Sequence, residues 1–244
     1  MKTPIIEVLS LSFAYPDGTT ALDCISLDVF EGECVGFVGP NGAGKTTLLL
    51  HLNGILSGRG KVIVDGLEVC DNNLRKIRQK VGIVFQDPDD QLFSQTVFDD
   101  IAFGPLSMRL ADNEVLSRVQ MALTQAGMEG FEKKAPHHLS FGQKKKASLA
   151  SILSMRPRII ALDEPTSNMD PRSRRRFLQL IKGLEATKIL STHDMESVRE
   201  LCNRVVVLDS GKLVADGEAQ SILSDRELME SHGLEVPLSL RCAP

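Results

Sequence analysis

The chain has 244 residues, of which 42% are hydrophobic and 25% are charged, and its formal net charge is −4. This composition is typical of a globular protein with a sizeable core, and it excludes collagen-like, disordered and disulfide-scaffold proteins. The longest apolar runs, such as Val205–Leu208, are far shorter than the roughly 18 to 20 residues that cross a bilayer, so any membrane span would come from other chains.

Short apolar runs bounded by turn signals alternate with segments of helical periodicity, which predicts an α/β fold around a mainly parallel sheet. The predicted strands are Ile5–Leu9, Ile25–Val29, Cys34–Val38, Val62–Val64, Gly82–Phe85, Ile159–Leu162, Ile189–Ser191 and Val205–Leu208. The predicted helices are Lys45–Leu56, Asp112–Ala126, Phe141–Ser154, Pro171–Ala186 and Met195–Cys202. The first strands are predicted to form an antiparallel β region beside the parallel core.

Residues from about 87 to 156 carry helical signals and almost no strand signals, so we expect a helical subdomain inserted into the α/β body. A single domain is predicted to span residues 1–244, with a short C-terminal tail from about 226 to 244. The N-terminus, Met1–Ile5, lacks the pattern of an export signal, and we expect the chain to stay in the cytosol.

Neither the cysteines nor the short basic runs are predicted to form a functional site. Five cysteines, an odd number without a C-x-x-C pair, argue against a disulfide framework or a zinc site and favour reduced, packed thiols. They are Cys24, Cys34, Cys70, Cys202 and Cys242. The runs Lys144–Lys146 and Arg174–Arg176 are interpreted as solvated helix faces, and the mildly acidic balance gives no reason to expect a nucleic-acid partner.

A glycine-rich turn joins the predicted strand Cys34–Val38 to the helix that begins at Lys45. It matches the phosphate-loop pattern G-x-x-x-x-G-K-[ST], in which backbone N–H groups and a helix N-terminus face one anion. Lys45 would add a charge for the β- and γ-phosphates of ATP, and Thr46 a hydroxyl for Mg²⁺. The residues predicted to bind the nucleotide here are Gly39, Pro40, Asn41, Gly42, Ala43, Gly44, Lys45, Thr46 and Thr47. A purely structural strand-to-helix turn is the less favoured alternative.

Two adjacent carboxylates follow the predicted buried strand Ile159–Leu162. Such a pair can place one group on a metal ion and the other beside an attacking water molecule, so we assign Asp163 to Mg²⁺ and Glu164 to general-base catalysis. Alone, an acidic strand end is a common turn feature. Together with the phosphate loop, the pair predicts Mg²⁺-dependent hydrolysis of ATP.

The sequence Leu139–Gln143, L-S-F-G-Q, resembles the L-S-G-G-Q signature of ABC transporter ATP-binding subunits. The resemblance extends over roughly residues 4 to 225 and implies a P-loop NTPase fold of the ABC ATPase type. It also implies two copies, favoured to be identical, packed head to tail so that Ser140, Gly142 and Gln143 of one copy contact the ATP of the other. Phe141 departs from the family pattern, which puts the catalytic contribution of the signature in doubt. Ser140 and Gln143 also read as a helix capping box, which is a structural alternative.

Four further positions match motifs of the same family. Gln86 matches the glutamine loop, whose side-chain amide reaches Mg²⁺ and water, and His193 matches the switch histidine, which contacts the γ-phosphate and orients the hydrolytic assembly. Asp170 matches the D-loop, although it also reads as a helix N-cap. Tyr15 stands where the family places an aromatic ring that stacks on adenine, and a surface tyrosine is the alternative.

The segment Gln86–Phe93, Q-D-P-D-D-Q-L-F, closely resembles the ATPases of energy-coupling factor importers, particularly the cobalt and nickel branch. This resemblance implies a transmembrane coupling protein and a small substrate-binding membrane protein as partners, and a peripheral position at the cytoplasmic face of the membrane. Four of the ten phenylalanines lie in Phe85–Phe103. They form either the core of the helical subdomain or an apolar groove for a helix of the membrane partner, with Phe98 chosen as the residue to test.

The transported solute stays open, because nothing in an ATPase touches it. A vitamin or another small solute is the alternative to cobalt or nickel. A soluble ABC ATPase that acts on nucleic acid or ribosomes is an alternative from another class. It is less favoured, because the stretch between Gln86 and Ser140 is too short for a coiled-coil insertion and the chain has neither zinc cysteines nor a second ATPase domain.

Overall fold

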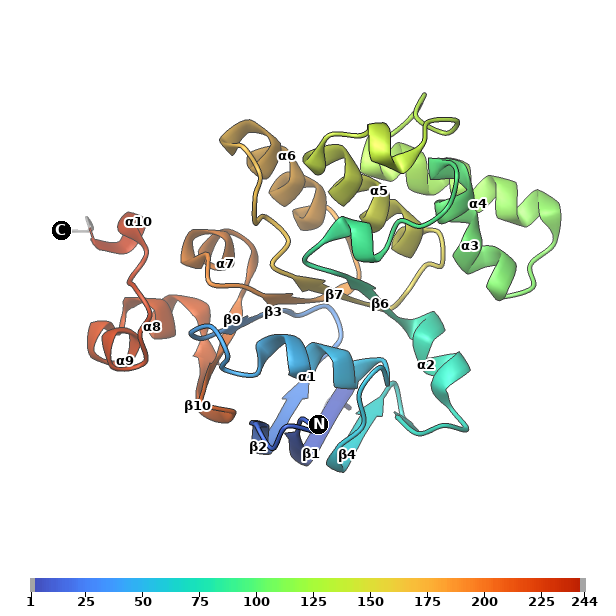
Figure 1. Ribbon diagram of the computed structural model, residues 1–244. Coiled ribbons are helices and arrows are strands. Elements are labelled where there is room, and N and C mark those ends of the chain that lie inside the picture. Colours follow the sequence, from blue (N-terminus) through green and yellow to red (C-terminus); the bar gives the residue numbers. More distant parts are fainter. Residues whose placement is uncertain (1–2, 242–244) are drawn as a thin grey trace.

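The computed structural model describes residues 3–241, and within them ten strands form two sheets (Figure 1). The N-terminal sheet is antiparallel and has the strand order β2-β1-β4-β5. The second sheet has the order β10-β9-β3-β8-β7-β6, and it is parallel apart from the β9–β10 pair. The strands are β1 (Ile6–Ala14), β2 (Thr20–Val29), β3 (Cys34–Val38), β4 (Arg59–Val64), β5 (Leu67–Glu68), β6 (Val81–Val84), β7 (Ile159–Asp163), β8 (Thr187–Ser191), β9 (Arg204–Asp209) and β10 (Lys212–Glu218).

Helices cover both faces of the parallel sheet (Figure 1). The helix α1 lies between this sheet and the antiparallel sheet, whereas α3 to α6 lie on the opposite face (Figure 1). The helices are α1 (Lys45–Leu52), α2 (Leu74–Lys80), α3 (Val97–Ser107), α4 (Asp112–Ala126), α5 (Phe141–Leu153), α6 (Pro171–Lys182), α7 (Met195–Leu201), α8 (Ala219–Ser224), α9 (Arg226–Ser231) and α10 (Leu238–Arg241), with 3-10 turns η1 (Pro88–Asp90) and η2 (Pro136–His138).

The continuous apolar runs of the sequence are strands of the parallel sheet that are buried on both faces. In β7, Ile160 and Leu162 pack with the helical layer, while Ile159 and Ala161 pack with α1 and the antiparallel sheet. Successive side chains of a strand point to opposite faces, so one short run contributes to two cores. The parallel sheet therefore forms the rigid centre of the molecule, and its carboxyl-end loops carry the predicted motifs.

The helical segment between β6 and β7 is present as predicted, but the sequence did not reveal α3. This helix contains Gly104 and Pro105, which are unfavourable inside helices. Two features offset them. The Thr96 side chain caps the helix by accepting a hydrogen bond from the N–H of Asp99. Gly104 allows close packing of Met155, because a Cβ on residue 104 would lie only 2.5 Å from the Cγ of Met155.

Three other observations differ from the predictions: the length of α1, the presence of β10 and the exposure of two cysteines. The predicted helix from Lys45 ends at Leu52, since Gly54 takes a left-handed φ of 68°. The strand β10 alternates between exposed and half-buried residues at the sheet edge, so it carries no apolar run to reveal it. Two of the four described cysteines, Cys24 and Cys70, are exposed rather than packed, and Cys242 lies outside the described residues.

Candidate active site

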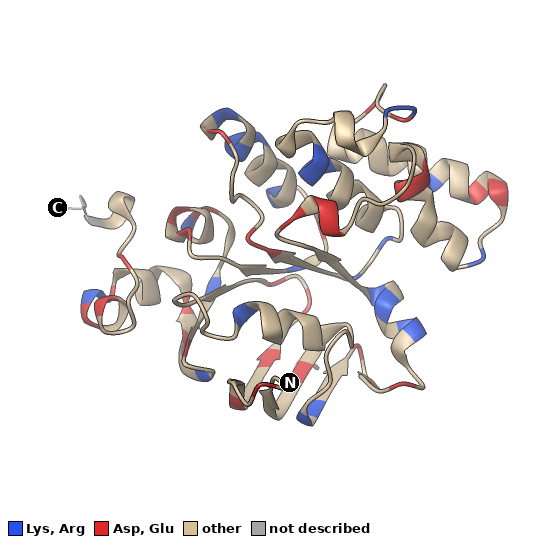
Figure 2. Cartoon of the chain, in the orientation of Figure 1, with Lys and Arg blue, Asp and Glu red and all other residues tan. Residues whose placement is uncertain are grey.

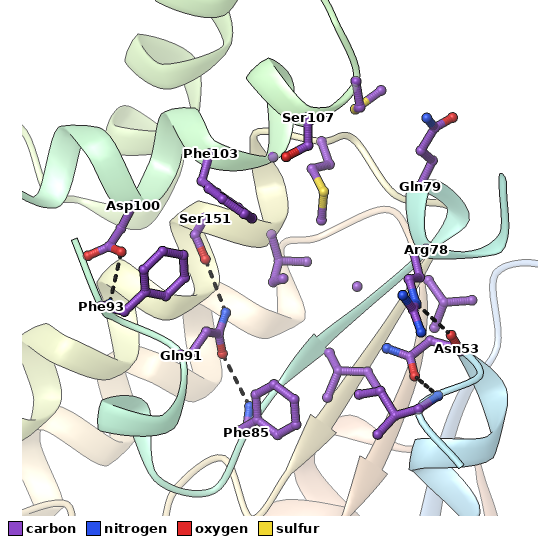
Figure 3. Close-up of a pocket in the computed structure, with 18 of the residues that line it drawn as sticks. Asn53, Arg78, Gln79, Phe85, Gln91, Phe93, Asp100, Phe103, Ser107 and Ser151 are labelled. Carbon is purple, nitrogen blue, oxygen red and sulfur yellow. Dashed lines mark hydrogen bonds between the residues drawn. The ribbon is translucent and has the colours of Figure 1, made fainter. Parts of the chain in front are cut away.

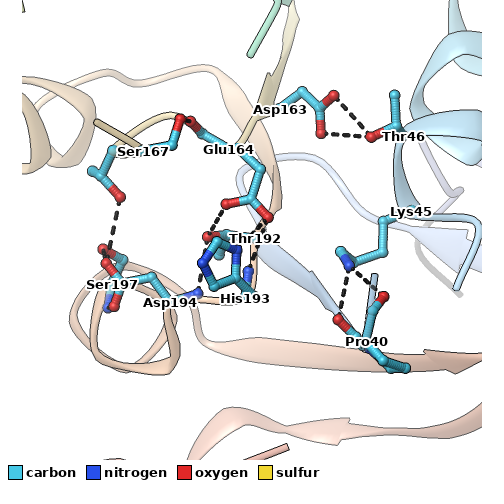
Figure 4. Close-up of polar contacts among 12 residues, drawn as sticks. Pro40, Lys45, Thr46, Asp163, Glu164, Ser167, Thr192, His193, Asp194 and Ser197 are labelled. Carbon is cyan, nitrogen blue, oxygen red and sulfur yellow. Dashed lines mark hydrogen bonds and ion pairs between the residues drawn. The ribbon is translucent and has the colours of Figure 1, made fainter. Parts of the chain in front are cut away.

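The loop between β3 and α1 wraps around the side chain of Lys45. At Gly44, φ is 98° and a Cβ would lie 2.3 Å from the carbonyl oxygen of Ala21, so only glycine fits this close approach. The Lys45 Nζ donates to the carbonyl oxygens of Gly39 and Pro40, at 2.7 and 2.9 Å (Figure 4). Burial lowers the pKa of Lys45, because an ammonium loses hydration there. The loop therefore holds the ammonium of Lys45 against its own carbonyl groups.

Two of the three residues predicted to bind Mg²⁺, Thr46 and Asp163, face each other. Thr46 Oγ1 donates to the carboxylate of Asp163, with distances of 3.0 and 2.9 Å to its two oxygens (Figure 4). Burial, followed by the adjacent charge of Glu164, raises the pKa of Asp163. A buried carboxylate beside a hydroxyl is a donor set that suits a hard divalent cation. Among residues 3–241, no group of three or more His, Cys, Asp or Glu side chains is arranged so that it could hold a metal ion.

The carboxylate of Glu164 is held by three donors at the end of β8. Its Oε1 accepts from the backbone N–H of His193 at 3.1 Å and from His193 Nδ1 at 2.8 Å, and its Oε2 accepts from Thr192 Oγ1 at 2.9 Å (Figure 4). Because a carboxylate oxygen only accepts, Nδ1 is the donor in this pair, and Nε2 is the second ring nitrogen of the largely exposed imidazole. Sequence reasoning missed Thr192, for which the only signal was a hydroxyl beside the switch histidine.

Many of these groups line one cavity of about 410 Å³, although Asp163 and Thr192 are not among its lining residues. The lining residues are Tyr15, Thr19, Thr20, Ala21, Asn41, Gly42, Ala43, Gly44, Lys45, Thr46, Thr47, Gln86, Glu164 and His193. The Tyr15 hydroxyl lies 2.9 Å from Thr47 Oγ1, and its ring packs edge-on against Phe13. The cavity thus brings Tyr15, the phosphate loop, Gln86, Glu164 and His193 together. The stretch from Thr19 to Ala21 joins them, although its sequence carries no motif.

The signature residues lie outside this cavity and begin the helix α5. Ser140 Oγ accepts from the N–H of Gln143 at 3.4 Å, and Gln143 Oε1 accepts from the N–H of Ser140 at 2.9 Å, so the predicted capping box is present. A Cβ at Gly142 would lie 3.4 Å from Ser173 at the start of α6. That helix is capped by Asp170, whose Oδ1 accepts from two backbone N–H groups at 3.0 Å. Within a single chain, the signature residues therefore do not line the cavity formed by the phosphate loop.

The basic run in α5 is only partly a solvated face, contrary to the prediction. Lys145 is fully buried, while Lys144 and Lys146 are half-buried. No local pattern indicates this burial, because it follows from the packing of α5 against the parallel sheet.

Comparison with known proteins identifies the family. Residues 22–167 match the family model of ABC transporters. The chain belongs to the ABC transporter ATP-binding family. The chain is 50% identical to a putative ABC transporter ATP-binding protein of Streptomyces avermitilis, over 97% of this chain and 91% of that protein. An energy-coupling factor transporter ATP-binding protein, EcfA, of Methanothermobacter thermautotrophicus is 48% identical, over 96% of this chain and 77% of that protein.

Solved structures of ABC ATPases share the fold. The CbiO1 protein of Clostridium perfringens, part of the ABC transporter complex CbiONQ, has a TM-score of 0.83 and 37% identity and covers 94% of each chain. A dimeric ATP-binding cassette bound to ADP and phosphate has a TM-score of 0.79 and 28% identity, over 88% of this chain and 98% of that one. The predicted P-loop fold is confirmed, and the chain is an ATP-hydrolysing ABC transporter subunit. Among residues 3–241, no helix is both long and apolar enough to cross a membrane.

Proposed function

We propose that this ABC ATPase powers a membrane importer of the energy-coupling factor type, with cobalt or nickel ions as the favoured solute. Similarity to EcfA proteins of Methanothermobacter thermautotrophicus and Carboxydothermus hydrogenoformans, at 48% and 46% identity, supports the importer type. Similarity to CbiO1 supports the metal ion, and a vitamin or another small solute is the alternative. In this proposal the chain is one ATPase domain, bound peripherally at the cytoplasmic face of the membrane through partner proteins.

The cavity geometry supports a division of roles among its residues. Lys45 and the backbone N–H groups of the phosphate loop hold the phosphates, and Tyr15 stacks on the adenine. The oxygens of Thr46, Asp163 and Gln86 hold Mg²⁺, which neutralises charge on the phosphates when bound. Thr46 lies at the start of α1, which follows β3, while Asp163 ends β7 and Gln86 lies in the loop after β6. Because β3, β7 and β6 belong to the parallel part of one sheet, their carboxyl ends lie at the same edge.

The base in this proposal is Glu164, which accepts a proton from the attacking water. Its two oxygens are held by Thr192 and His193, so the carboxylate needs little reorganisation before it acts. In this proposal the Nε2 atom of His193, carrying a proton, would donate to an oxygen of the γ-phosphate. Both groups line the cavity that also contains Lys45.

Two copies are needed to complete this site. The signature residues Ser140, Gly142 and Gln143 lie outside the cavity of their own chain, at the N-terminus of α5, where backbone N–H groups favour an anion. A head-to-tail homodimer would bring this helix start to the ATP on the partner's phosphate loop. The dimeric state of the related ATP-binding cassettes supports this arrangement. Closure on ATP and reopening after hydrolysis would then drive the membrane partner between states.

The observation that carries the importer proposal is an apolar groove of about 610 Å³ between the helical layer and α2 (Figure 3). Phe93 and Phe103 lie on one side, with ring centroids 5.1 Å apart, and remain 67% and 54% exposed. A pair of aromatic rings exposed to solvent beside an apolar groove is typical of a protein-binding surface. The positions of Phe93 and Phe103 therefore support the hypothesis of an apolar groove for a partner helix. Phe98, the residue that the sequence analysis selected for testing, packs against the helical core instead.

The lining of the groove also includes a buried carboxylate. Asp100 is 4% exposed, and its Oδ1 accepts from the N–H groups of Phe93 and Ser94 at 3.1 and 3.0 Å. Its Oδ2 has no hydrogen-bond partner within the described part of the chain. Arg78 of the basic helix α2 lies on the other wall (Figures 2 and 3). An amphipathic helix that presents apolar side chains to Phe93 and Phe103 would fit this groove, as expected of a segment from a membrane coupling protein.

Replacing Phe103 by Asp tests the groove. We expect this substitution to abolish detergent co-purification of a polytopic membrane protein with the tagged chain, because a charge would be buried in the apolar contact. Leu116→Asp is the matched control, since Leu116 is similarly exposed, at 57%, but lies on α4 and does not line the groove. Capture of the same membrane protein by the Phe103 variant would contradict the docking role. Recovery of ribosomes or nucleic acid alone would favour the soluble ATPase, and uptake of Co²⁺, Ni²⁺ or a vitamin by the recovered complex would identify the solute.

A further inference from the structure

Lys145 lies on α5 and connects the two loops that carry the base and the glutamine motif. Its side chain is fully buried. The ammonium donates to the carbonyl oxygen of Phe85 at 3.2 Å and to that of Glu164 at 3.3 Å. Phe85 directly precedes Gln86, and Glu164 directly follows β7. One buried cation therefore holds both loops against the helix that begins at the signature.

The carbonyl held at Glu164 belongs to a strained residue. Glu164 has a φ of 41°, in the left-handed region, which costs a non-glycine residue free energy. Its carbonyl oxygen accepts from Lys145 and, at 2.9 Å, from Ser167 Oγ. These donors stabilise the backbone conformation from which the carboxylate reaches Thr192 and His193.

Lys145 also supplies positive charge beneath the acidic pair. Asp163 and Glu164 are 5% and 8% exposed, and together with Asp87 they attract the ammonium of Lys145. Burial lowers the pKa of Lys145 to about 8, so the ammonium is protonated at neutral pH. The residues that line the nucleotide cavity include Glu164 but not Lys145. Lys145 therefore acts on the cavity through Glu164 and the Gln86 loop.

We propose that Lys145 is a positioning residue for ATP hydrolysis, whose ammonium fixes the backbone of Glu164 and of the Gln86 loop against α5. This inference rests on the role proposed above for Glu164 as the base. It predicts that loss of the ammonium slows turnover and leaves ATP binding largely unchanged, because the groups that would contact the phosphates and adenine stay in place.

The test compares steady-state ATP hydrolysis by the purified full-length chain and its variants. For Lys145→Met we expect kcat to fall about tenfold or more, with KM for ATP within about twofold of wild type. Lys145→Arg, which keeps the charge and the donors, should recover part of the loss, and Lys145→Gln, a neutral donor, should recover less. Lys146→Met removes the same charge from the adjacent, half-buried position and should match wild type.

Three results would overturn the proposal: unchanged kcat in both Lys145→Met and Lys145→Gln, a rise of KM in step with the fall of kcat, or an equal loss in Lys146→Met. Glu164→Gln is measured in parallel to separate this inference from the proposed base. Turnover retained in that variant would remove Glu164 as the base. Turnover lost in Glu164→Gln but kept in the Lys145 variants would overturn only the positioning role.

Discussion

The burial of Lys145 predicts a specific dependence of folding stability on pH. Its pKa is about 8 in the folded chain, against an ordinary value of 10.5, because burial disfavours the ammonium. Below pH 8 the lysine is protonated in both states, and the folded state carries the full cost of burying the charge. Between pH 8 and 10.5 the folded chain loses the proton first, so this cost disappears as the pH rises.

The size of the effect follows from the gap between the two pKa values. A gap of about 2.5 pH units corresponds to about 3 kcal/mol at pH 7, and most of this is removed by pH 10. The side chain is fully buried, so solvent screening does not reduce the value. Lys145→Met removes the ionisation cost together with two hydrogen bonds to carbonyl groups, and the loss of those bonds depends little on pH.

Urea denaturation of wild type and Lys145→Met at pH 7 and pH 10 measures the change. The free energy of unfolding of the variant minus that of wild type should decrease by about 2 to 3 kcal/mol between the two pH values. Lys146→Met is the control and should show almost no change. If the Lys145→Met difference stays constant within about 0.5 kcal/mol, the ammonium is not buried as the structure shows, and the reasoning fails.

Three other predictions address the nucleotide. Glu164→Gln should still bind ATP and accumulate as a closed dimer by size-exclusion chromatography, with turnover lowered by at least about a hundredfold; wild-type hydrolysis would exclude Glu164 as the base. Lys45→Ala should weaken ATP binding by about thirtyfold or more, which corresponds to about 2 kcal/mol for a lost charge-assisted contact, and unchanged affinity in equilibrium binding would contradict the phosphate-loop assignment. Because Tyr15 is the single tyrosine and tryptophan is absent, ATP should alter tyrosine fluorescence, and an unaltered spectrum would count against the adenine stack.

Features that depend on contacts between near neighbours in the chain could be predicted from the sequence. The phosphate loop, the capping box of Ser140 and Gln143 and the N-cap of Asp170 each form within a few residues, so their spacing alone specifies them. The strands of the parallel sheet were visible for a related reason: burial on both faces requires a continuous apolar run. The fold class and the family followed from these local signals.

Features that depend on contacts between distant segments were decided by the tertiary structure. Thr192 reaches Glu164 across 28 residues of chain, and Phe103 rather than Phe98 faces the groove, because packing selects which side of α3 meets the core. Lys145 is the clearest case. Three consecutive lysines read as a solvated face, yet the middle one lies beneath the base, where two carbonyl groups and nearby carboxylates offset its desolvation. The sequence determines which chemical groups are available, but their burial depends on which element covers them, and no local pattern contains that information.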